Sequence, residues 1–410
     1  MNFRLNLELQ PRTFNYMDLR PSDIQTKFHE LFKKEPLVVR APGRINLIGE
    51  HTDYNDGFVM PAAVDKEIFF GIAASNDGRS VFYSIKYDER FEVDINDPKP
   101  VDKPQWANFL LGVLFQFKEN GFPVKPFYCV FGGNVPLGAG MSSSAAMECG
   151  FAFALSEFNL LNVPRLKIIT MAQWAEHHFV GVKCGIMDQF ASVMGKEGHA
   201  LVLDCRSLQH RYAPLDLREY AIILCDTKVK HSLVDSEYNT RRKECETGVK
   251  VLQQYHSQVK SLRDVSLEML EQHRTEFPGK VYNRCLYVVQ EILRVQQASA
   301  DLDKNDLKAF GRQMFETHEG LSALYEVSCK ELDFLVAEAK KFDGVLGARM
   351  MGGGFGGCTI NLVKSDRAGR FITEMQEKYQ KTFSIDMPAY RVKIVDGVSR
   401  VHEENLALWA

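Results

Sequence analysis

The sequence lacks the features that mark secreted, membrane-spanning or nucleic-acid-binding chains. Its nine cysteines are odd in number and form no C-x-x-C pair, which argues against a zinc site and against a disulfide framework. No apolar run approaches the roughly 20 residues of a membrane span, and the N-terminus has no uninterrupted apolar core of a signal peptide. A formal net charge of −3 gives no electrostatic reason to bind nucleic acid or an anionic membrane. We therefore expect a cytoplasmic protein with reduced thiols and neither of these partners.

Length and composition predict a globular protein with two domains. A chain of 410 residues is long for one typical core, and 45% hydrophobic with 25% charged residues are ordinary values. Strand-like runs dominate the first half and helical patterns the middle of the second half, with the change near residues 208–217. Because strands and helices follow an irregular order, we expect an α+β fold rather than a doubly wound sheet.

The expected elements follow from hydrophobic periodicity. The strands are short apolar or alternating runs at residues 38–48, 67–74, 80–85, 127–135, 200–203, 220–225, 358–363 and 390–394. The helices lie at residues 142–158, 166–179, 232–255, 280–297 and 306–324. The N-terminal segment, residues 1–20, receives no assignment.

A loop rich in glycine and serine, residues 136–146, follows the fourth expected strand. Gly138 and Gly140 let the backbone approach a ligand closely, and a helix then begins at three serines, Ser142, Ser143 and Ser144. Free backbone amides and the positive end of the helix dipole favour an anion there. A capped helix would need a single serine, so phosphate binding is the favoured interpretation. The chain contains no G-x-x-x-x-G-K-[ST] segment, so the loop is not a Walker A motif.

A second glycine-rich segment, residues 352–357, matches the dinucleotide-binding pattern G-x-G-x-x-G only formally. That pattern must open a helix, whereas residues 358–363 have strand character. A flexible turn between two elements is the competing interpretation.

Ionisable side chains are concentrated in residues 43–55, directly after an apolar run. Arg44, Glu50, His51 and Asp53 fall within ten positions, a density that suits a site for a polyhydroxylated ligand. Asp188 stands later in an apolar segment, and buried aspartates are rare unless they are paired. Taken in isolation, Asp188 would be interpreted as a helix cap.

Together these segments resemble the galactokinases, a branch of the GHMP small-molecule kinases. The resemblance spans about residues 35–395 and has four segments in the family's order: residues 44–55, 136–146, 184–190 and 349–357. Met141 stands where the family usually has leucine and Met351 where threonine is common; the first exchange nearly conserves volume. The resemblance implies a two-domain GHMP architecture, residues 1–212 and 213–410, with the active site in the cleft between the domains.

The resemblance also implies roles for individual residues. The residues implied to contact the sugar are Arg44, Glu50, His51, Asp53, Gly185, Asp188 and Tyr238. Nucleotide contacts fall to Trp106, Pro136, Gly138, Ala139, Gly140, Met141, Ser142, Ser143 and Ser144. The metal ligands implied are Ser144 and Glu176, whose hard oxygen atoms suit Mg²⁺. For Tyr238 and Trp106 a place in the hydrophobic core is a competing interpretation, and for Glu176 a solvated helix surface.

The activity implied is a sugar kinase that acts as a monomer. ATP with Mg²⁺ would phosphorylate the anomeric hydroxyl of α-D-galactose, giving galactose 1-phosphate and ADP, the initial step of galactose catabolism. The catalytic residues would be Asp188 and Arg44, in one of two ways. Asp188 accepts the hydroxyl proton, or Asp188 orients the hydroxyl while Arg44 stabilises charge on the phosphoryl group.

Two alternatives remain. The first is a kinase for N-acetylgalactosamine, which would need a larger pocket beside C2 of the sugar. The second is a non-catalytic sensor of galactose and ATP. The sensor is disfavoured because the serine run of the phosphate loop is complete and Asp188 is present.

Overall fold

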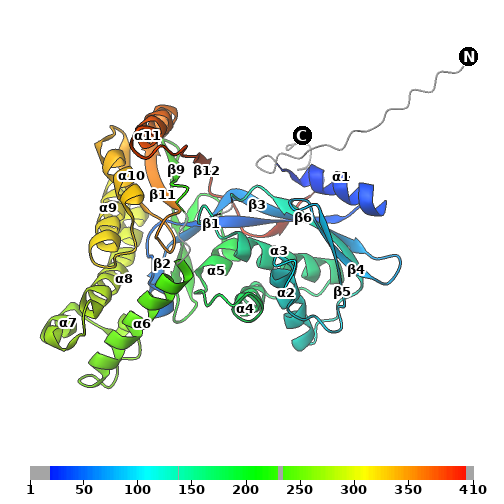
Figure 1. Cartoon of the computed structure of the whole chain (residues 1–410), viewed down its shortest axis with the longest axis horizontal. Coiled ribbons are helices and arrows are strands. Elements are labelled where there is room, and N and C mark those ends of the chain that lie inside the picture. Colours follow the sequence, from blue (N-terminus) through cyan, green and yellow to red (C-terminus); the bar gives the residue numbers. More distant parts are fainter. Residues whose placement is uncertain (1–18, 137, 230–233, 403–410) are drawn as a thin grey trace, which may run out of the picture.

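Two main sheets, each covered by helices, form the protein (Figure 1). The structure, a computed structural model, describes residues 19–136, 138–229 and 234–402. Most of the unassigned segment 1–20 lies outside these residues, as does the start of the helix predicted at residues 232–255. The mixture of helices and strands confirms the predicted α+β class.

The first half of the chain builds a six-stranded sheet with the order β13-β1-β3-β6-β4-β5. All neighbouring strands are antiparallel except β4 and β6. The strands are β1 (Leu37–Asn46), β3 (Pro61–Ala74), β4 (Ser80–Ser84), β5 (Glu89–Val93), β6 (Phe127–Gly133) and β13 (Ser399–Arg400). The central strands β1, β3 and β6 are apolar over most of their length because helices bury both of their faces.

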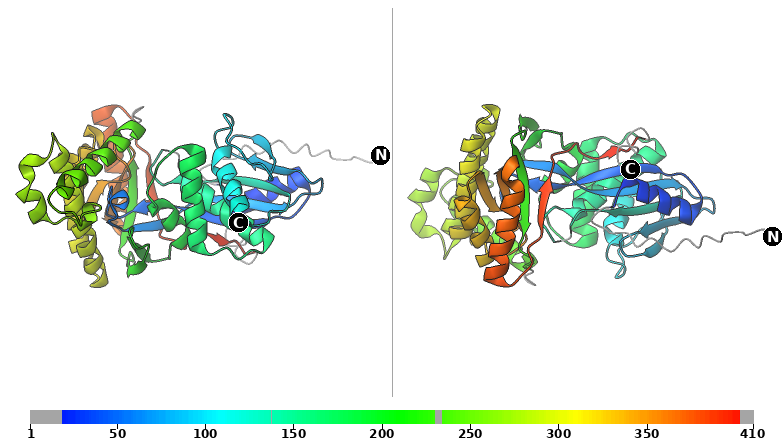
Figure 2. Two further views of the ribbon diagram at one scale, coloured as in Figure 1. Left: turned by 90° about the horizontal axis from the view of Figure 1, so that it is seen from below. Right: turned by 90° about the horizontal axis from the view of Figure 1, so that it is seen from above.

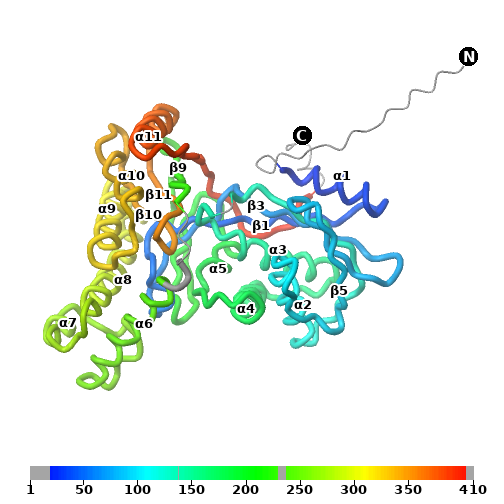
Figure 3. The backbone as a smooth tube through the Cα atoms, viewed as in Figure 1, coloured from blue at the N-terminus to red at the C-terminus, as the bar shows by residue number. Residues whose placement is uncertain are grey.

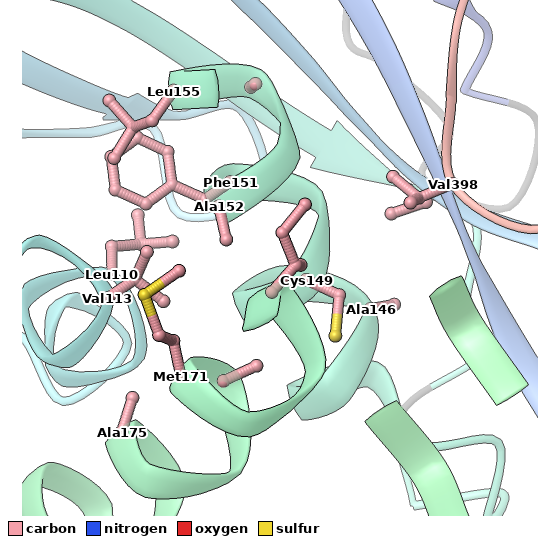
Figure 4. Close-up of a cluster of buried hydrophobic side chains, with 14 of the residues drawn as sticks. Leu110, Val113, Ala146, Cys149, Phe151, Ala152, Leu155, Met171, Ala175 and Val398 are labelled. Atoms are coloured by element: carbon pink, nitrogen blue, oxygen red, sulfur yellow. The ribbon is translucent and has the colours of Figure 1, made fainter. Parts of the chain in front are cut away.

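Helix α1 (Pro21–Phe32) lies on one face of this sheet and four helices lie on the other, as Figure 1 shows. The four are α2 (Ala107–Glu119), α3 (Ser143–Asn159), α4 (Arg165–Ala175) and α5 (Met187–Met194). Successive strand residues point to opposite faces. Phe69 therefore packs with Phe28 of α1, whereas Phe70 packs against Phe151 of α3. Figure 4 shows part of the core in which α2, α3 and α4 meet.

The second half builds a four-stranded antiparallel sheet with the order β10-β11-β9-β12. Its strands are β9 (Tyr220–Asp226), β10 (Val345–Met350), β11 (Cys358–Lys364) and β12 (Ala389–Val392). Alternate residues of β9 serve two cores. Ile223 packs with α10 (Lys330–Lys341) and α11 (Ala368–Phe383), and Leu224 packs toward α8 (Val281–Asp303) and α9 (Leu307–Ala323).

Smaller elements complete the fold. A three-stranded sheet has the order β2-β7-β8, with β2 (Phe58–Val59), β7 (His199–Asp204) and β8 (His210–Pro214). Helices α6 (Val234–Gln253) and α7 (Leu267–Gln272) pack on α8. Short turns are η2 (Asp53–Asn55), the π-helical η3 (Glu176–Val180), η4 (Leu262–Asp264), η5 (Arg274–Glu276) and η6 (Ser365–Arg367).

The two halves of the chain are joined by a shared core. Ile45 and Leu47, at the end of β1 and beyond it, pack with residues of β9, α8 and α9. The two views of Figure 2 show the blue-to-cyan first half at one end of the molecule and the yellow-to-orange helices at the other. The last described segment returns to the first sheet, where Arg400 of β13 pairs with Val39 of β1; Figure 3 traces it in red.

Most of the expected elements are present with shifted bounds, and one of them changes its helix type before its predicted end. The helix predicted at residues 166–179 ends as an α-helix at Ala175 and continues as the π-helical turn η3. This turn places Glu176 inward, at 6% exposure, which a solvated helix surface would not do. π-helical turns of this kind occur frequently at functional sites.

The position of η3 depends on a close approach between α2 and α4. A Cβ atom on Gly112 of α2 would lie 2.6 Å from Cβ of Ala175 and 3.1 Å from Cβ of Phe179. We predict that Gly112→Ala lowers the free energy of unfolding by about 1–3 kcal/mol, because the contact must open. Gly369→Ala in α11 is the matched control, since its Cβ would meet no atom within 4 Å. Urea unfolding midpoints should fall for the first variant and not for the second; equal midpoints would contradict this packing.

Candidate active site

Arg44 of β1 and Asp188 of α5 form a bidentate ion pair at the centre of the site. Nε of Arg44 donates to Oδ1 of Asp188 at 2.7 Å, and Nη2 donates to Oδ2 at 2.9 Å. The third nitrogen, Nη1, donates to the backbone carbonyl of Gly140 in the glycine-serine loop. Arg44 is buried, whereas Asp188 keeps 23% of its side chain exposed. The pair therefore joins three segments and leaves the carboxylate open to a ligand.

The glycine-serine loop has the geometry of an anion-binding loop. Gly138 and Gly140 have φ angles of +74° and +72°, in the left-handed region that glycine adopts without strain. Helix α3 begins directly after the loop, at Ser143, so its free amides and positive dipole end face the loop. Ser142 stands at the N-cap position with a φ of +52°, and its side chain makes no capping bond. Its hydroxyl instead donates to Oδ2 of Asp188 at 2.5 Å.

A pocket of about 230 Å³ opens beside this ion pair. It is smaller than the roughly 300–1,000 Å³ typical of sites for drug-sized ligands, so it suits a small molecule. Eight of the predicted site residues line it: Arg44, Glu50, His51, Asp53, Glu176, Gly185, Asp188 and Tyr238. The lining is completed by Val182, Cys184, Met187, Gly352 and Gly353. Both halves of the sequence contribute, because Tyr238, Gly352 and Gly353 come from beyond β9.

Asp53 stands at one wall of the pocket against Gly185. A Cβ atom on Gly185 would lie 1.7 Å from Oδ2 of Asp53, so any side chain at this position would require Asp53 to move. Burial, and next the negative charge of Asp188, raise the pKa of Asp53 to about 6. Near neutral pH Asp53 is therefore mostly ionised and places a second negative charge near the carboxylate of Asp188.

Glu50 is fixed by a buried arginine from β10. Nη1 and Nη2 of Arg349 both lie 3.1 Å from Oε1 of Glu50, and the backbone amide of Gly352 donates to the same atom at 2.8 Å. Arg349 is fully buried and also donates through Nε to the carbonyl of Leu47 at 2.9 Å. Because these bonds converge on Oε1, the carboxylate's other oxygen is left for a ligand.

His51 is a neutral imidazole at the back of the pocket. Burial lowers its pKa to about 4. Its Nδ1 is hydrogen-bonded to the hydroxyl of Tyr54 at 2.8 Å, and that hydroxyl is 2.8 Å from the hydroxyl of Tyr325. Nε2 is buried without a hydrogen-bond partner among the described residues. The ring of Tyr238 lies 5.5 Å from the ring of His51 and covers the same side of the pocket.

Glu176 and Ser144 meet beside Asp188 in a setting that suits a hard cation. Their side chains lie within hydrogen-bonding reach of each other, and burial, followed by the charge of Asp188, raises the pKa of Glu176. A bound cation would offset both of these unfavourable effects. A hydroxyl and a carboxylate beside a phosphate-type loop form the sparse oxygen donor set from which Mg²⁺ takes a few ligands, the rest coming from phosphate and water. The residues present therefore fit Mg²⁺.

Trp106 is not brought to this pocket. It is buried in the core of the first sheet, where its ring packs against Phe91 and Phe131 and its Nε1 donates to Glu89 at 2.8 Å. Of the remaining predicted residues, Pro136, Ala139, Met141 and Ser143 belong to the glycine-serine loop and its helix start, and the backbone carbonyl of Met141 accepts from the amide of Arg44 at 3.1 Å. The nucleotide role of Trp106 stays a prediction.

Comparison with known proteins identifies the family. Residues 26–74 match the galactokinase galactose-binding signature, residues 108–196 the GHMP kinases N terminal domain and residues 298–381 the GHMP kinases C terminal domain. A galactokinase of Thermotoga maritima is 43% identical over 89% of this chain and all of its own length. The chain belongs to the galactokinase family. A galactokinase of Clostridium acetobutylicum is 38% identical over 92% of this chain and 98% of its own.

Solved structures agree with this assignment. The Lactococcus lactis galactokinase complexed with galactose superimposes with a TM-score of 0.88 at 33% identity, covering 93% of this chain and 99% of that one. The Methanococcus jannaschii mevalonate kinase superimposes with a TM-score of 0.64 at 16% identity over 89% of this chain, which shows a shared GHMP kinase fold alone. No helix among the described residues is long and apolar enough to cross a membrane.

Several residues of this galactokinase-family site were not predicted from the sequence. Arg349 was recognised only as part of a motif, and Tyr54, Tyr325 and Gln189 received no role. Arg349 and Tyr325 lie roughly 300 and 270 positions from the groups they contact, so no local pattern could connect them. Tyr54 does stand within the charged segment 43–55, and that position was the one available signal.

The raised pKa of Asp53 gives a stability prediction for this galactokinase-family chain. The pKa is about 6 in the folded state and 3.8 as its ordinary value, so the folded protein loses stability as pH rises from about 4 to 7. Asp53→Asn removes this loss. The free energy of unfolding of the variant, measured relative to that of the parent, should therefore rise by about 2 kcal/mol from pH 4 to pH 7.5. Chemical denaturation at both pH values measures it, and a pH-independent difference would contradict the buried, raised carboxyl.

Proposed function

We propose that this chain is an ATP-dependent galactose kinase that phosphorylates the anomeric hydroxyl. The observation that carries the proposal is the bidentate Arg44–Asp188 pair, which stands where the anion-binding loop meets the small polar pocket. A phosphoryl group held on the loop and a hydroxyl held in the pocket would meet at Asp188. The family and the galactose-bound relative support galactose as the sugar.

The sugar would be held by side chains whose free atoms face the pocket. Glu50 offers the oxygen not taken by Arg349, His51 offers Nε2, and Asp53 offers a carboxylate beside Gly185. Fixed acceptors of this kind discriminate between epimers, because a displaced hydroxyl leaves a buried polar group unpaired. Tyr238 would cover the ring from the α6 side.

The nucleotide phosphates would lie on the loop of residues 136–144 and at the start of α3. Ser144 and Glu176 would hold Mg²⁺, which supplies charge neutralisation on the phosphate oxygens when it is bound. Trp106 lies in the core of the first sheet. We do not assign it a direct contact with the adenine.

Asp188 has one acceptor position left for the sugar hydroxyl. A carboxylate offers about four lone-pair positions, and Arg44 occupies two and Ser142 a third. These donors stabilise its negative charge, so we infer that Asp188 first orients the hydroxyl and accepts its proton late. The bond from the sugar oxygen to the γ-phosphorus forms, the bond from that phosphorus to ADP breaks, and the proton passes to Asp188. Arg44 stabilises the transferring group's charge.

We also propose the domain arrangement around the site, the oligomeric state and the cellular location. The site would lie in the cleft between a domain of residues 1–212 and a domain of residues 213–410, consistent with the mixed origin of the pocket lining. We propose that the chain acts as a monomer, with the pocket lined by residues of one chain. All nine cysteines are free thiols, consistent with a cytoplasmic location.

The test is ADP release with galactose, N-acetylgalactosamine, glucose and arabinose, with ³¹P NMR to locate the phosphate. We expect galactose to give the highest kcat/KM, at least about 100-fold above glucose, and a phosphate on O1. Asp188→Ala should abolish turnover yet still bind nucleotide, which makes it the control. A preference for N-acetylgalactosamine, or binding of galactose and ATP without turnover, would overturn the proposal in favour of the two alternatives.

A further inference from the structure

A buried polar cluster lies behind Glu176, and the mechanism above does not use it. Glu148 of α3 and Gln189 of α5 are both fully buried. Neither oxygen of Glu148 has a hydrogen-bond donor among the described residues, and neither does Oε1 of Gln189. Three unpaired buried acceptors would cost several kcal/mol if nothing satisfied them. Native structures rarely retain such groups without a reason.

The amide of Gln189 links this cluster to the proposed metal site. Its Nε2 donates to Oε2 of Glu176 at 2.7 Å and lies 3.6 Å from Sγ of Cys184. Sγ of Cys184 donates to the same Oε2 of Glu176 at 3.3 Å. Both bonds therefore hold one oxygen of Glu176. An amide donor fixes that oxygen without cancelling its charge, which an arginine or lysine would do.

One proton on Glu148 would pair one of its oxygens with Oε1 of Gln189. The side chains of Glu148 and Gln189 are within hydrogen-bonding reach. Because Nε2 of Gln189 is committed to Glu176, its Oε1 can only accept, and an ionised Glu148 could give it nothing. A neutral Glu148 donates its O–H to Oε1. Burial, and next the nearby charge of Glu176, raise the pKa of Glu148 well above its ordinary value and outweigh the lowering effect of the contact with Gln189, which favours the neutral form.

We propose that Gln189 is a positioning residue that sets the orientation of Glu176 for the metal–nucleotide complex, and that Glu148 holds Gln189 through its protonated carboxyl. The helices that carry these side chains, α3 and α5, also carry residues of the proposed active site. Ser144 and Glu148 are four residues apart on one face of α3, and Gln189 directly follows Asp188. Partners behind a ligand commonly orient it and tune its affinity in this way. The inference rests on the proposed ligand role of Glu176.

Calorimetry on the whole protein tests it by comparing the Kd of ADP with and without Mg²⁺. In Gln189→Met, which keeps the volume and removes the donor, we expect the enhancement of ADP binding by Mg²⁺ to fall about tenfold or more. Binding of galactose should stay within about twofold of the parent. Glu148→Gln should keep the enhancement, because its new amide donates to Oε1 of Gln189 as the carboxyl proton did. Ser192→Ala is the matched control. Ser192 also lies on α5, and its buried hydroxyl donates to the carbonyl of Pro42 and not to Glu176.

The outcomes distinguish the positioning role of Gln189 from the metal-ligand role of Glu176. If Glu176→Gln removes the enhancement while Gln189→Met retains it, the positioning role is wrong and the ligand role stands. If Glu176→Gln also leaves the enhancement unchanged, the ligand role itself fails, and this inference fails with it. An equal loss in Gln189→Met and Ser192→Ala, or a loss in Glu148→Gln, would show a merely structural contribution. Should Gln189→Met not fold, Gln189→Glu at the same position is the second variant and is expected to give the same loss.

Discussion

The bidentate contact between Arg44 and Asp188 is the interaction on which the site depends. One guanidinium group binds the carboxylate with two nitrogens and the carbonyl of Gly140 with the third. Ser142 binds the same carboxylate from the loop. Strand β1, the glycine-serine loop and helix α5 are thereby placed relative to one another by charge-assisted bonds, which are short and directional. A phosphoryl donor and a hydroxyl acceptor need this kind of fixed geometry more than they need a strong base.

A second set of buried contacts fixes the segment of residues 43–55 at the pocket. Arg349 reaches from β10 to Glu50, and Glu291 of α8 accepts from the backbone amide of Gly49 at 2.9 Å. Buried ion pairs contribute little net stability, because removing both charges from water is costly. The effect of the two contacts named above is on position, because each attaches the charged segment 43–55 to an element from the second half of the chain. The pocket is therefore built by residues far apart in the sequence.

The sequence predicted the α+β class and eight of the residues that line the pocket, some from local patterns and the others from the resemblance to a family. Arg44, Glu50, His51 and Asp53 are close together in the chain, and the glycine-serine loop has its own signature. What it did not predict depends on long-range contact or on backbone geometry. The partner of Glu50 lies 299 positions away, the left-handed conformation of Ser142 turns its hydroxyl from the helix to Asp188, and the π-helical turn at Glu176 has no distinctive composition. Strand β13 is two residues long and gives no periodic pattern.

The central claim is that Arg44 and Asp188 act as one unit, and a double-mutant cycle on kcat/KM tests it directly. The variants are Arg44→Lys, which keeps the charge and loses the planar geometry, Asp188→Asn, and their combination. If the pair acts as a unit, the double variant should lose about as much as the worse single variant, which corresponds to a coupling free energy on the order of 2 kcal/mol or more. Losses that simply add would contradict the account, because each side chain would then contribute to the rate without the other.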